Sequence, residues 1–232
     1  MSETRRSNIV VVAGTDSGVG KTWVTGALAR ALAASGTSVR AVKLIETGCS
    51  DDAREREDGV ILAHATGQEA PLEALYRFPD DMAPVLAAER IGVTLDFDEL
   101  LMAAERHAER CDILLLEGAS GLLSPFTWEW CLVDVAQALE ARAVLVGSDR
   151  LGTLSHSLLT LGALELAAVP VVDTVLTPPA TADPSTGTNA EALKRLSGVP
   201  RVVTVPRTDD PELAAESLRP VAERLLTAHA HS

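Results

Sequence analysis

"VVVAGTDSGVGKTWVTGALARAL", residues 10–32, joins an apolar run to a segment of helical period through a glycine-rich loop. Within it, "GTDSGVGKT" (14–22) is a variant of the pattern G-x-x-x-x-G-K-[ST], with five residues instead of four between Gly14 and Gly20 and with Lys21 and Thr22 at its end. Such a loop between a strand and a helix turns backbone N–H groups and the positive helix N-terminus toward phosphate. The stretch therefore predicts a nucleotide site in which Lys21 reaches the outer phosphates and the Thr22 hydroxyl ligates Mg²⁺.

Strand-length apolar runs alternate with segments of helical period along the whole chain. The predicted strands cover residues 8–14, 38–45, 111–118, 142–148, 169–176 and 200–206. The predicted helices cover 21–36, 58–67, 83–92, 96–110 (with Asp96 as N-cap), 131–141, 154–168, 189–198 and 210–226, the last interrupted at Pro220. Because the strands are continuous Val, Ile and Leu runs, we expect a doubly wound α/β fold, with a mostly parallel sheet and helices on both faces, as in P-loop NTPases. The length suits a single domain over 1–232.

The chain is acidic, with a net charge of −13 at pH 7 and a pI near 4.8. This charge argues against general binding of nucleic acid or anionic membranes, although backbone N–H groups can still hold phosphate. No apolar run approaches the roughly 20 residues of a membrane span, and the N-terminal run is too short for a signal peptide, so we expect a cytoplasmic protein. Three widely spaced cysteines, Cys49, Cys111 and Cys131, match no zinc or disulfide pattern.

Three charged side chains lie where a ligand site is expected, beyond the carboxyl ends of the strands. Lys43 closes the second strand, where it is either a surface lysine or a cation beside the phosphates. Glu117 ends a buried strand, and a carboxylate there is costly unless it is paired or binds a metal, so Glu117 is a candidate Mg²⁺ ligand. Asp58 opens a helix after the charged run 51–59 and is either an N-cap or a further Mg²⁺ group. The turn-rich segment 177–189 is either functional or mobile.

The glycine-rich loop alone leaves several classes of protein open. A small GTPase needs an N-K-x-D motif for its base, and the sequence has none. Partition-type ATPases carry a lysine early in the loop, as in K-G-G-x-G-K-T, where this chain has Thr15, Asp16 and Ser17. The loop therefore argues against a dimerising switch ATPase but does not exclude a sugar or nucleoside kinase.

Six motifs together resemble the dethiobiotin synthetase family. The family patterns G-T-x-T-x-V-G-K-T, K-P-x-x-[ST]-G, a helix-opening Asp, a P-x-x-P/A-rich stretch, V-E-G-A-G-G and L-G-x-[IL]-N-H are compared, in this order, with "GTDSGVGKT" (14–22), "KLIETG" (43–48), Asp58, "FPDDMAPVLAAERIG" (78–92), "LEGASG" (116–121) and "LGTLSH" (151–156). Their common order and spacing are far more specific than the phosphate loop by itself.

The resemblance implies an ATP- and Mg²⁺-dependent cyclo-ligase of biotin synthesis, which carboxylates diaminononanoate with CO₂ and closes a cyclic urea through a carbamate and a carbamic–phosphoric anhydride. It implies a homodimer, with the substrate site at the interface. The implied catalytic residues are Lys21, Lys43 and Thr47, and the implied metal ligands are Thr22, Asp58 and Glu117. Nucleotide contacts are expected from Ser17, Gly18, Val19, Gly20, Lys21, Thr22, Thr177, Pro178 and Asn189. Substrate contacts are expected from Thr15, Thr47, Leu151, Gly152, Thr153 and Leu154.

The sequence also departs from the family at named positions. Leu44 replaces a Pro, Ser120 a Gly and Ser155 an Asn, and "DTVLTPP" (173–179) stands where some members read adenine with Asn-Asp. These differences leave the nucleotide and metal chemistry intact but keep alternatives open. They are a related ligase or kinase acting on another amine or acid, an ATP-using synthetase like the nucleotide domain of cobyrinate amidating enzymes, and a partition-type switch.

Overall fold

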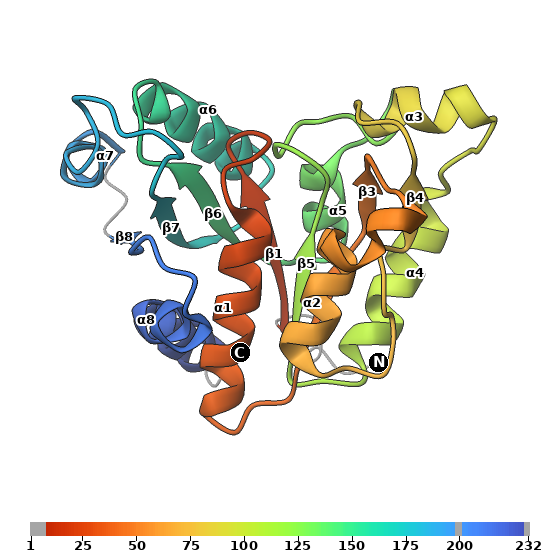
Figure 1. Ribbon diagram of the computed structural model, residues 1–232, viewed down its shortest axis with the longest axis horizontal. Coiled ribbons are helices and arrows are strands. Elements are labelled where there is room, and N and C mark those ends of the chain that lie inside the picture. Colours follow the sequence, from red (N-terminus) through yellow and green to blue (C-terminus); the bar gives the residue numbers. More distant parts are fainter. Residues whose placement is uncertain (1–7, 198–200, 230–232) are drawn as a thin grey trace.

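The computed structural model describes residues 8–197 and 201–229, and it has the predicted doubly wound α/β architecture. Six parallel strands form the main sheet in the order β2-β5-β1-β6-β7-β8 (Figure 1). Their bounds are Ile9–Gly14 for β1, Val39–Lys43 for β2, Ile113–Glu117 for β5, Arg142–Ser148 for β6, Val171–Thr177 for β7 and Val202–Thr204 for β8. From the central strand β1 the chain continues to β2 on one side and later to β6, β7 and β8 on the other. The phosphate loop after β1 therefore lies where the strand order reverses, which is where such folds bind ligands.

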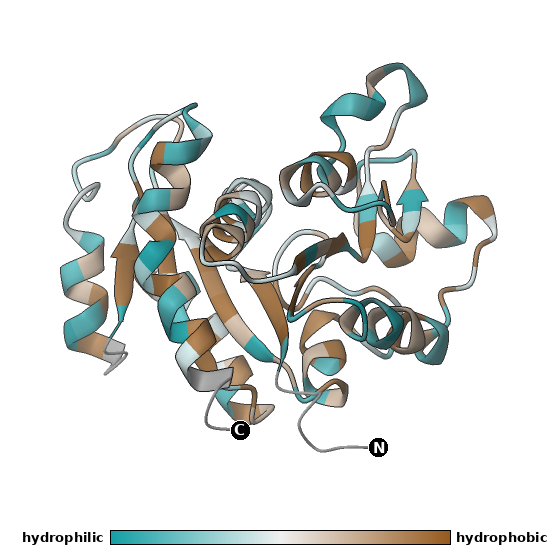
Figure 2. Ribbon diagram, turned by 90° about the horizontal axis from the view of Figure 1, so that it is seen from below, coloured by the Kyte–Doolittle hydropathy of each residue, from teal (hydrophilic) through white to brown (hydrophobic). Residues whose placement is uncertain are grey.

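The valine run of β1 accounts for the two-sided core. Val10 and Val12 pack into a cluster with α1 (Lys21–Ala34), α2 (Asp58–Thr66) and α8 (Pro211–His229). Val11 and Ala13 point the other way, into a cluster with α3 (Pro84–Ile91), α4 (Phe97–Ala108), α5 (Leu132–Ala138) and α6 (Thr153–Leu166). Figure 2 shows the strands as an apolar layer between helices with polar outer faces. Alternate side chains of one strand are thus buried on opposite sides of the sheet.

A second, two-stranded parallel sheet was not expected from the sequence. It pairs β3 (Ile45–Thr47) with β4 (Tyr76–Phe78), and a 3₁₀ helix, η2 (Asp51–Arg56), follows β3. The predicted strand 38–45 is therefore split, because the backbone leaves the main sheet after Lys43 and pairs with β4 instead. The strands of this small sheet have three residues each, too short for a periodic signal.

The end of the chain also differs from its prediction. Residues 211–229 form one helix with Pro220 inside it, rather than a helix interrupted there. Leu218, Val221 and Leu225 are fully buried against the core, whereas Pro220 is exposed. Packing of the apolar face thus outweighs the loss of one backbone hydrogen bond at the proline. The remaining helix is α7 (Asn189–Ser197), and residues 198 and 200 of the predicted elements lie outside the described residues.

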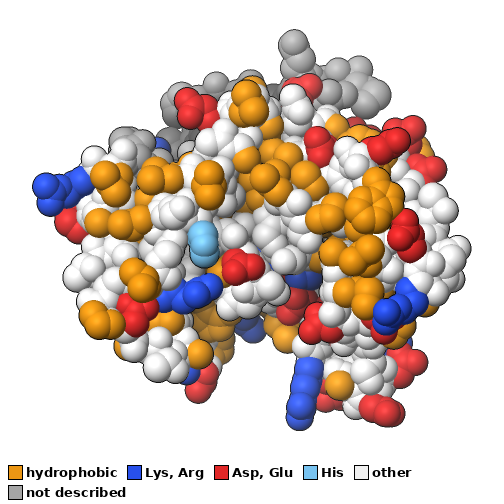
Figure 3. Space-filling view, turned by 90° about the horizontal axis from the view of Figure 1, so that it is seen from above, with side chains coloured by type: hydrophobic (Ala, Val, Ile, Leu, Met, Phe, Trp, Pro, Cys, Tyr) orange, Lys and Arg blue, Asp and Glu red, His pale blue; other side chains and the backbone are white. Residues whose placement is uncertain are grey.

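The outer surface carries exposed apolar side chains. Among the residues that the structure describes, none of the helices combines the length and hydropathy of a membrane span. Exposed hydrophobic side chains gather on the face shown in Figure 3, which looks down on the phosphate-loop end of the sheet. Leu158, Leu159 and Leu166 of α6 are among the exposed large hydrophobic residues.

A buried ion pair attaches α8 to the sheet. Asp173 on β7 is fully buried, and Arg224 on α8 donates to both of its oxygens, Nε at 2.7 Å and Nη2 at 2.7 Å. Burial raises the pKa of Asp173, and Arg224 partly offsets this. Removing the arginine leaves the carboxylate without its charge partner in a dry site, which is strongly destabilising.

We expect Arg224→Ala to lower the free energy of unfolding by about 3 kcal/mol, as measured by urea denaturation at pH 7. The matched control is Arg219→Ala, one turn earlier on α8, where the exposed partner is Glu216. Its loss is expected to be below about 1 kcal/mol. Equal effects of the two substitutions would contradict a special role for the buried pair.

Candidate active site

The phosphate loop has the geometry that its sequence predicts. Gly20 caps α1 in the left-handed region at φ 88°, and Lys21 is the first helical residue. The Lys21 side chain folds back over the loop, and its Nζ donates to the Asp16 carbonyl at 3.1 Å. A Cβ on Gly14 would lie 2.8 Å from Lys21 Cδ, so glycine is required there. The ammonium group is held at the mouth of the loop, where a phosphate would lie.

Burial, together with the neighbouring Lys43, lowers the pKa of Lys21 to about 8. The carboxylates of Glu117 and Asp58 oppose this shift without cancelling it. The loop therefore holds a cation that is incompletely neutralised by the protein and gains from an incoming anion.

Glu117 is the centre of the site. It ends β5, is fully buried, and lies opposite Lys43 in the parallel register of β2 and β5. One carboxylate oxygen accepts from Thr22 Oγ1 at 2.7 Å and from Lys43 Nζ at 2.7 Å. The other accepts from Thr25 Oγ1 at 2.7 Å. Thr25 was not predicted from the sequence. It lies three residues after Thr22, a spacing that places both hydroxyls on one side of α1.

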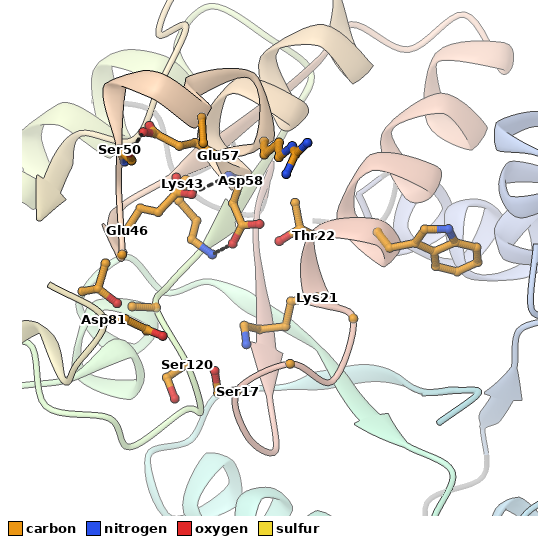
Figure 4. Close-up of a pocket in the computed structure, with 18 residues that line it drawn as sticks. Ser17, Lys21, Thr22, Lys43, Glu46, Ser50, Glu57, Asp58, Asp81 and Ser120 are labelled. Atoms are coloured by element: carbon orange, nitrogen blue, oxygen red, sulfur yellow. Dashed lines mark hydrogen bonds and ion pairs between the residues drawn. The ribbon is translucent and has the colours of Figure 1, made fainter. Parts of the chain in front are cut away.

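Lys43 connects the two acidic residues predicted to bind a metal. Its Nζ donates to Asp58 Oδ2 at 2.6 Å as well as to Glu117, and its side chain is almost completely buried (Figure 4). Burial alone disfavours the charge on Lys43, but Glu117 and Asp58 outweigh it and raise the pKa of the lysine. The reciprocal effect lowers the pKa of Asp58 despite its own burial. Both groups are charged at neutral pH.

The donors around this ion pair fit a small hard cation. Thr22 offers a hydroxyl, and Asp58 and Glu117 offer carboxylates, which are the oxygen ligands that Mg²⁺ takes beside nucleotide phosphates. The two carboxylates face one ammonium group, that of Lys43, so the cluster keeps a net negative charge that a bound cation would offset. The sequence thus identified three groups that the fold brings together from β5 and the starts of α1 and α2.

A cavity of about 500 Å³ opens beside these residues. Its lining includes the loop residues Ser17, Gly18, Gly20, Lys21 and Thr22 together with Lys43, Thr47, Asp58 and Ser120. Figure 4 shows these side chains converging from the phosphate loop, the small sheet and the start of α2. The cavity has room for phosphate groups and a small substrate side by side.

A second hollow, of about 230 Å³, lies on the other side of the phosphate loop. It is lined by the loop residues 18–20, Thr177 and Pro178, as predicted for nucleotide contacts, and also by Trp23 and residues 206–209. Residues 206–209 were not predicted to line a ligand site. They follow the last strand, whose end was not among the strand ends expected to bind a ligand. The Thr177 hydroxyl donates to Val19 O at 2.8 Å, so this side chain holds the phosphate loop against β7.

Asn189 lies apart from both cavities. Its side chain is buried, and its Nδ2 donates to Asp149 Oδ1 at 2.7 Å and to Ser185 O at 2.9 Å. Asp149 also accepts from the Gly187 amide at 2.8 Å. Asn189 lines neither of these two cavities, and its nucleotide contact stays a prediction. Its bonds join the end of the 177–189 segment to Asp149, which follows β6.

The predicted substrate residues divide into two groups. Thr47 ends β3 and lines the larger cavity, and Thr15 lines a third hollow of about 310 Å³ between the phosphate loop and α6. Residues 151–154 lie at the start of α6, outside these cavities. There the Leu151 amide donates to Asp183 Oδ2 at 2.7 Å, and the Thr153 side chain is buried. The neighbouring Arg150 pairs with Asp16 of the phosphate loop, Nη2 to Oδ2 at 3.7 Å.

Two departures from the family pattern have structural explanations. The Leu44 amide donates to Glu117 O at 2.8 Å, a bond that a proline could not make. Ser120 adopts φ 55°, in the left-handed region where glycine is unstrained. The serine therefore keeps the backbone path of the glycine that it replaces, at a cost of about 1 kcal/mol. Its side chain adds a hydroxyl to the wall of the larger cavity.

Comparison with known proteins places the chain among nucleotide-using enzymes. The sequence model of an AAA domain matches residues 8–215. The ATP-dependent dethiobiotin synthetase of Anaeromyxobacter dehalogenans is 38% identical over 190 residues, covering 80% of this chain and 84% of the relative. The enzyme of the same name from Streptomyces coelicolor is 37% identical over 224 residues, covering 95% and 90%. That from Aquifex aeolicus is 30% identical over 218 residues, covering 94% and 97%.

Solved structures share the fold at low sequence identity. The cell division ATPase MinD of Pyrococcus furiosus has a TM-score of 0.57 and 17% identity, with coverage of 95% of this chain and 99% of that one. A plasmid partition protein of Borrelia burgdorferi has a TM-score of 0.59 and 12% identity, with coverage of 95% and 99%. This likeness confirms the P-loop NTPase-like architecture and says nothing about a switch function.

We expect the affinity for ADP, measured by calorimetry without divalent metal, to be steady below pH 8 and to fall above it. A bound polyphosphate favours the charged form of Lys21 and so raises its pKa above the value of about 8 in the free protein. Above pH 8 the free protein has lost this proton and must take it up on binding. The affinity then declines by up to about tenfold per pH unit.

The Lys21→Ala variant is the control, because it should bind ADP more weakly but lack the decline above pH 8. Proton uptake can be read directly by repeating the wild-type titration in buffers of different ionisation enthalpy. An affinity that is constant from pH 7 to 10 would contradict the shifted pKa.

Proposed function

The chain belongs to the family of ATP-dependent dethiobiotin synthetases and is an ATP-dependent ligase of biotin synthesis, and we propose how its residues divide the work. The observation that carries the proposal is the set of two buried cations and two carboxylates at the phosphate loop. Lys21 and Lys43 both face the larger cavity, and Asp58 and Glu117 hold Lys43 in place.

The reaction joins two anions, which explains the need for dense positive charge. One amine of the diamine takes up CO₂ and loses a proton, giving a carbamate. A carbamate oxygen attacks the γ-phosphorus of ATP, and ADP leaves with the electrons of the broken P–O bond. The second amine attacks the carbonyl carbon of the resulting carbamic–phosphoric anhydride and loses a proton, and phosphate leaves with the electrons of the broken C–O bond as the cyclic urea closes.

Lys21 and Lys43 have distinct positions for these steps. Lys21 lies over the phosphate loop and would neutralise the outer phosphates as charge moves onto ADP. Lys43 lines the same cavity as the loop residues and Thr47, where it would orient the carbamate against the γ-phosphorus. Thr47 would hold the carbamate or the diamine by its hydroxyl. Exclusion of water by the buried strand ends strengthens both charge interactions.

Mg²⁺ would be held by Thr22, Asp58 and Glu117. Bound with ATP, it would neutralise charge on the β- and γ-phosphates. Two observations support this assignment. The three residues offer oxygen ligands, and the two carboxylates face only one ammonium group, that of Lys43.

Nucleotide contacts divide between the two sides of the loop. Backbone amides of Ser17, Gly18, Val19 and Gly20, with Lys21 and Thr22, would hold the phosphates. The base would lie in the hollow beside Thr177 and Pro178, which Trp23 and residues 206–209 complete.

We propose a homodimer in which each subunit completes the substrate site of its partner. Residues 151–154 open α6 and would offer amides to the carboxylate of a diamine bound in the second subunit, since they line none of the three hollows beside the phosphate loop of their own chain. The exposed side chains of Leu151, Leu158, Leu159 and Leu166 give this end of the molecule and α6 an apolar surface suited to a second copy. Leu151 would have to exchange its bond to Asp183 for one to the substrate.

We expect incubation with diaminononanoate, bicarbonate, Mg²⁺ and ATP to release one phosphate for each dethiobiotin formed. Phosphate release and the cyclic urea are followed together, the latter by mass spectrometry. Absence of product above a control without enzyme would refute the substrate assignment. Bicarbonate-dependent phosphate release with a different diamine or amino acid would instead identify a relative of changed specificity.

Lys43→Ala is expected to lower kcat by about 100-fold or more, because it removes a preorganised cation from the reacting groups. Lys194→Ala is the matched control, since Lys194 lies exposed on α7, far in sequence from the site. Thermal unfolding with Mg²⁺ and ATP checks that both variants are folded. Normal turnover in the folded Lys43→Ala protein would remove this lysine from the mechanism.

A further inference from the structure

The small sheet of β3 and β4 lies outside the phosphate loop, but two of its side chains bind the start of α2. Glu46 on β3 and Arg77 on β4 are paired residues in the register of this sheet. Together they bind three consecutive residues, 57–59, at the start of α2. Glu46 accepts from the amides of Asp58 and Gly59, the latter at 2.9 Å. Arg77 donates to both oxygens of Glu57, Nε at 2.8 Å and Nη2 at 2.6 Å.

The two carboxylates in these contacts are buried and hydrogen-bonded. Glu46 is 7% exposed and Glu57 is 6% exposed. A carboxylate is retained in such a place only when donors satisfy it. For Glu46 the donors are the first amides of a helix, where the helix dipole also favours negative charge. The bonds therefore define where α2 begins, and they include the backbone of Asp58 itself.

The same end of α2 is also fixed by close packing. A Cβ on Gly59 would lie 2.2 Å from the Ala74 nitrogen, so the helix start is pressed against the segment that leads into β4. α2 has only nine residues, too few to be stable by itself in water. Its position, and with it the position of the Asp58 carboxylate, depends on the small sheet.

We propose that Glu46 and Arg77 are positioning residues that hold the Asp58 carboxylate at the metal end of the nucleotide site. They act through the first turn of α2, and they need not touch nucleotide or metal. The inference rests on the proposed function in one respect, the assignment of Asp58 to Mg²⁺. It adds an explanation for the small sheet, whose paired residues carry opposite charges aimed at one helix terminus.

A metal site at Glu46 itself is the competing explanation. One ligand atom each of Glu46, Cys49 and Glu57 lies within 4.8 Å of the others. The carboxylates already have donors, however, with Glu46 bound to two amides and Glu57 bound to Arg77 and to the Ser50 amide. Burial raises the pKa of the Cys49 thiol to about 11, so it is protonated at neutral pH. The cluster is a set of satisfied acceptors rather than a vacant chelate.

The test measures the coupling between Mg²⁺ and ADP, which needs neither diamine nor turnover. ADP affinity is determined by calorimetry without metal and at increasing Mg²⁺ for the wild type, Glu46→Ala and Glu46→Gln. Glu46→Ala is expected to raise the Mg²⁺ concentration for half-maximal tightening by about 10- to 100-fold, as for partners that orient metal ligands elsewhere. The metal-free affinity should stay unchanged, because the phosphate loop is intact. Glu46→Gln should be affected less, since its amide oxygen still accepts one bond.

Two further variants complete the design. Arg77→Met removes the second contact and should shift the Mg²⁺ requirement in the same direction. Glu55→Ala removes an exposed carboxylate from η2, so it changes the local charge without changing the contacts of α2, and it should match the wild type. Thermal unfolding identifies variants that fail to fold, and Glu46→Gln keeps the test decisive if Glu46→Ala is one of them.

The outcomes separate the inference from the proposed function. A folded Glu46 variant with the wild-type Mg²⁺ requirement overturns the positioning role. Equal losses of metal-free and Mg²⁺-dependent affinity overturn it as well, because they indicate general damage to the site. A wild type without dethiobiotin synthesis but with Mg²⁺-coupled ADP binding would refute the substrate assignment and leave the positioning role standing.

Discussion

The ion pair between Lys43 and the fully buried Glu117 is the constraint on which the site depends. A carboxylate at the end of a central strand is retained only because a cation and two threonine hydroxyls satisfy it. Those partners come from the neighbouring strand β2 and the first turn of α1. The arrangement therefore requires the strand order that puts β5 between β1 and β2. Any other order would leave Glu117 buried without its partners.

The site is assembled by two layers of structure with different tasks. The main sheet and α1 supply the phosphate loop, Lys43 and Glu117, as in many nucleotide-binding proteins of this fold. The small sheet and α2 supply Asp58 and Thr47, which face the cavity opposite the loop. Fold likeness to cell division and partition ATPases concerns the first layer. In the proposed mechanism, the ligase chemistry depends on how the second layer is placed against the first.

The sequence predicted the elements that are determined by a local pattern of residues. The continuous valines of β1, the glycine-rich loop and Asp96, which caps α4 as expected, are local features whose physics does not depend on distant contacts. Pro220 shows where local reasoning fails, because the buried face of α8 outweighs the missing hydrogen bond. The strands β3 and β4 carry too few residues for any periodicity, and each forms only because the other is present. Asn189 was predicted to contact nucleotide because it ends the segment that stands where some family members read adenine; its bond to Asp149 is a contact that the sequence does not reveal.

The sequence by itself determined the phosphate loop, the α/β class and the types of residue at the strand ends, because spacing and composition along the chain encode them directly. It also carried the motif order that identifies the family. Only the tertiary structure decided that Lys43 joins Asp58 to Glu117, that Thr25 completes the carboxylate's partners, and that Glu46 and Arg77 hold the start of α2. These are contacts between segments far apart in the chain. Their existence depends on strand register and helix packing, which no local pattern specifies.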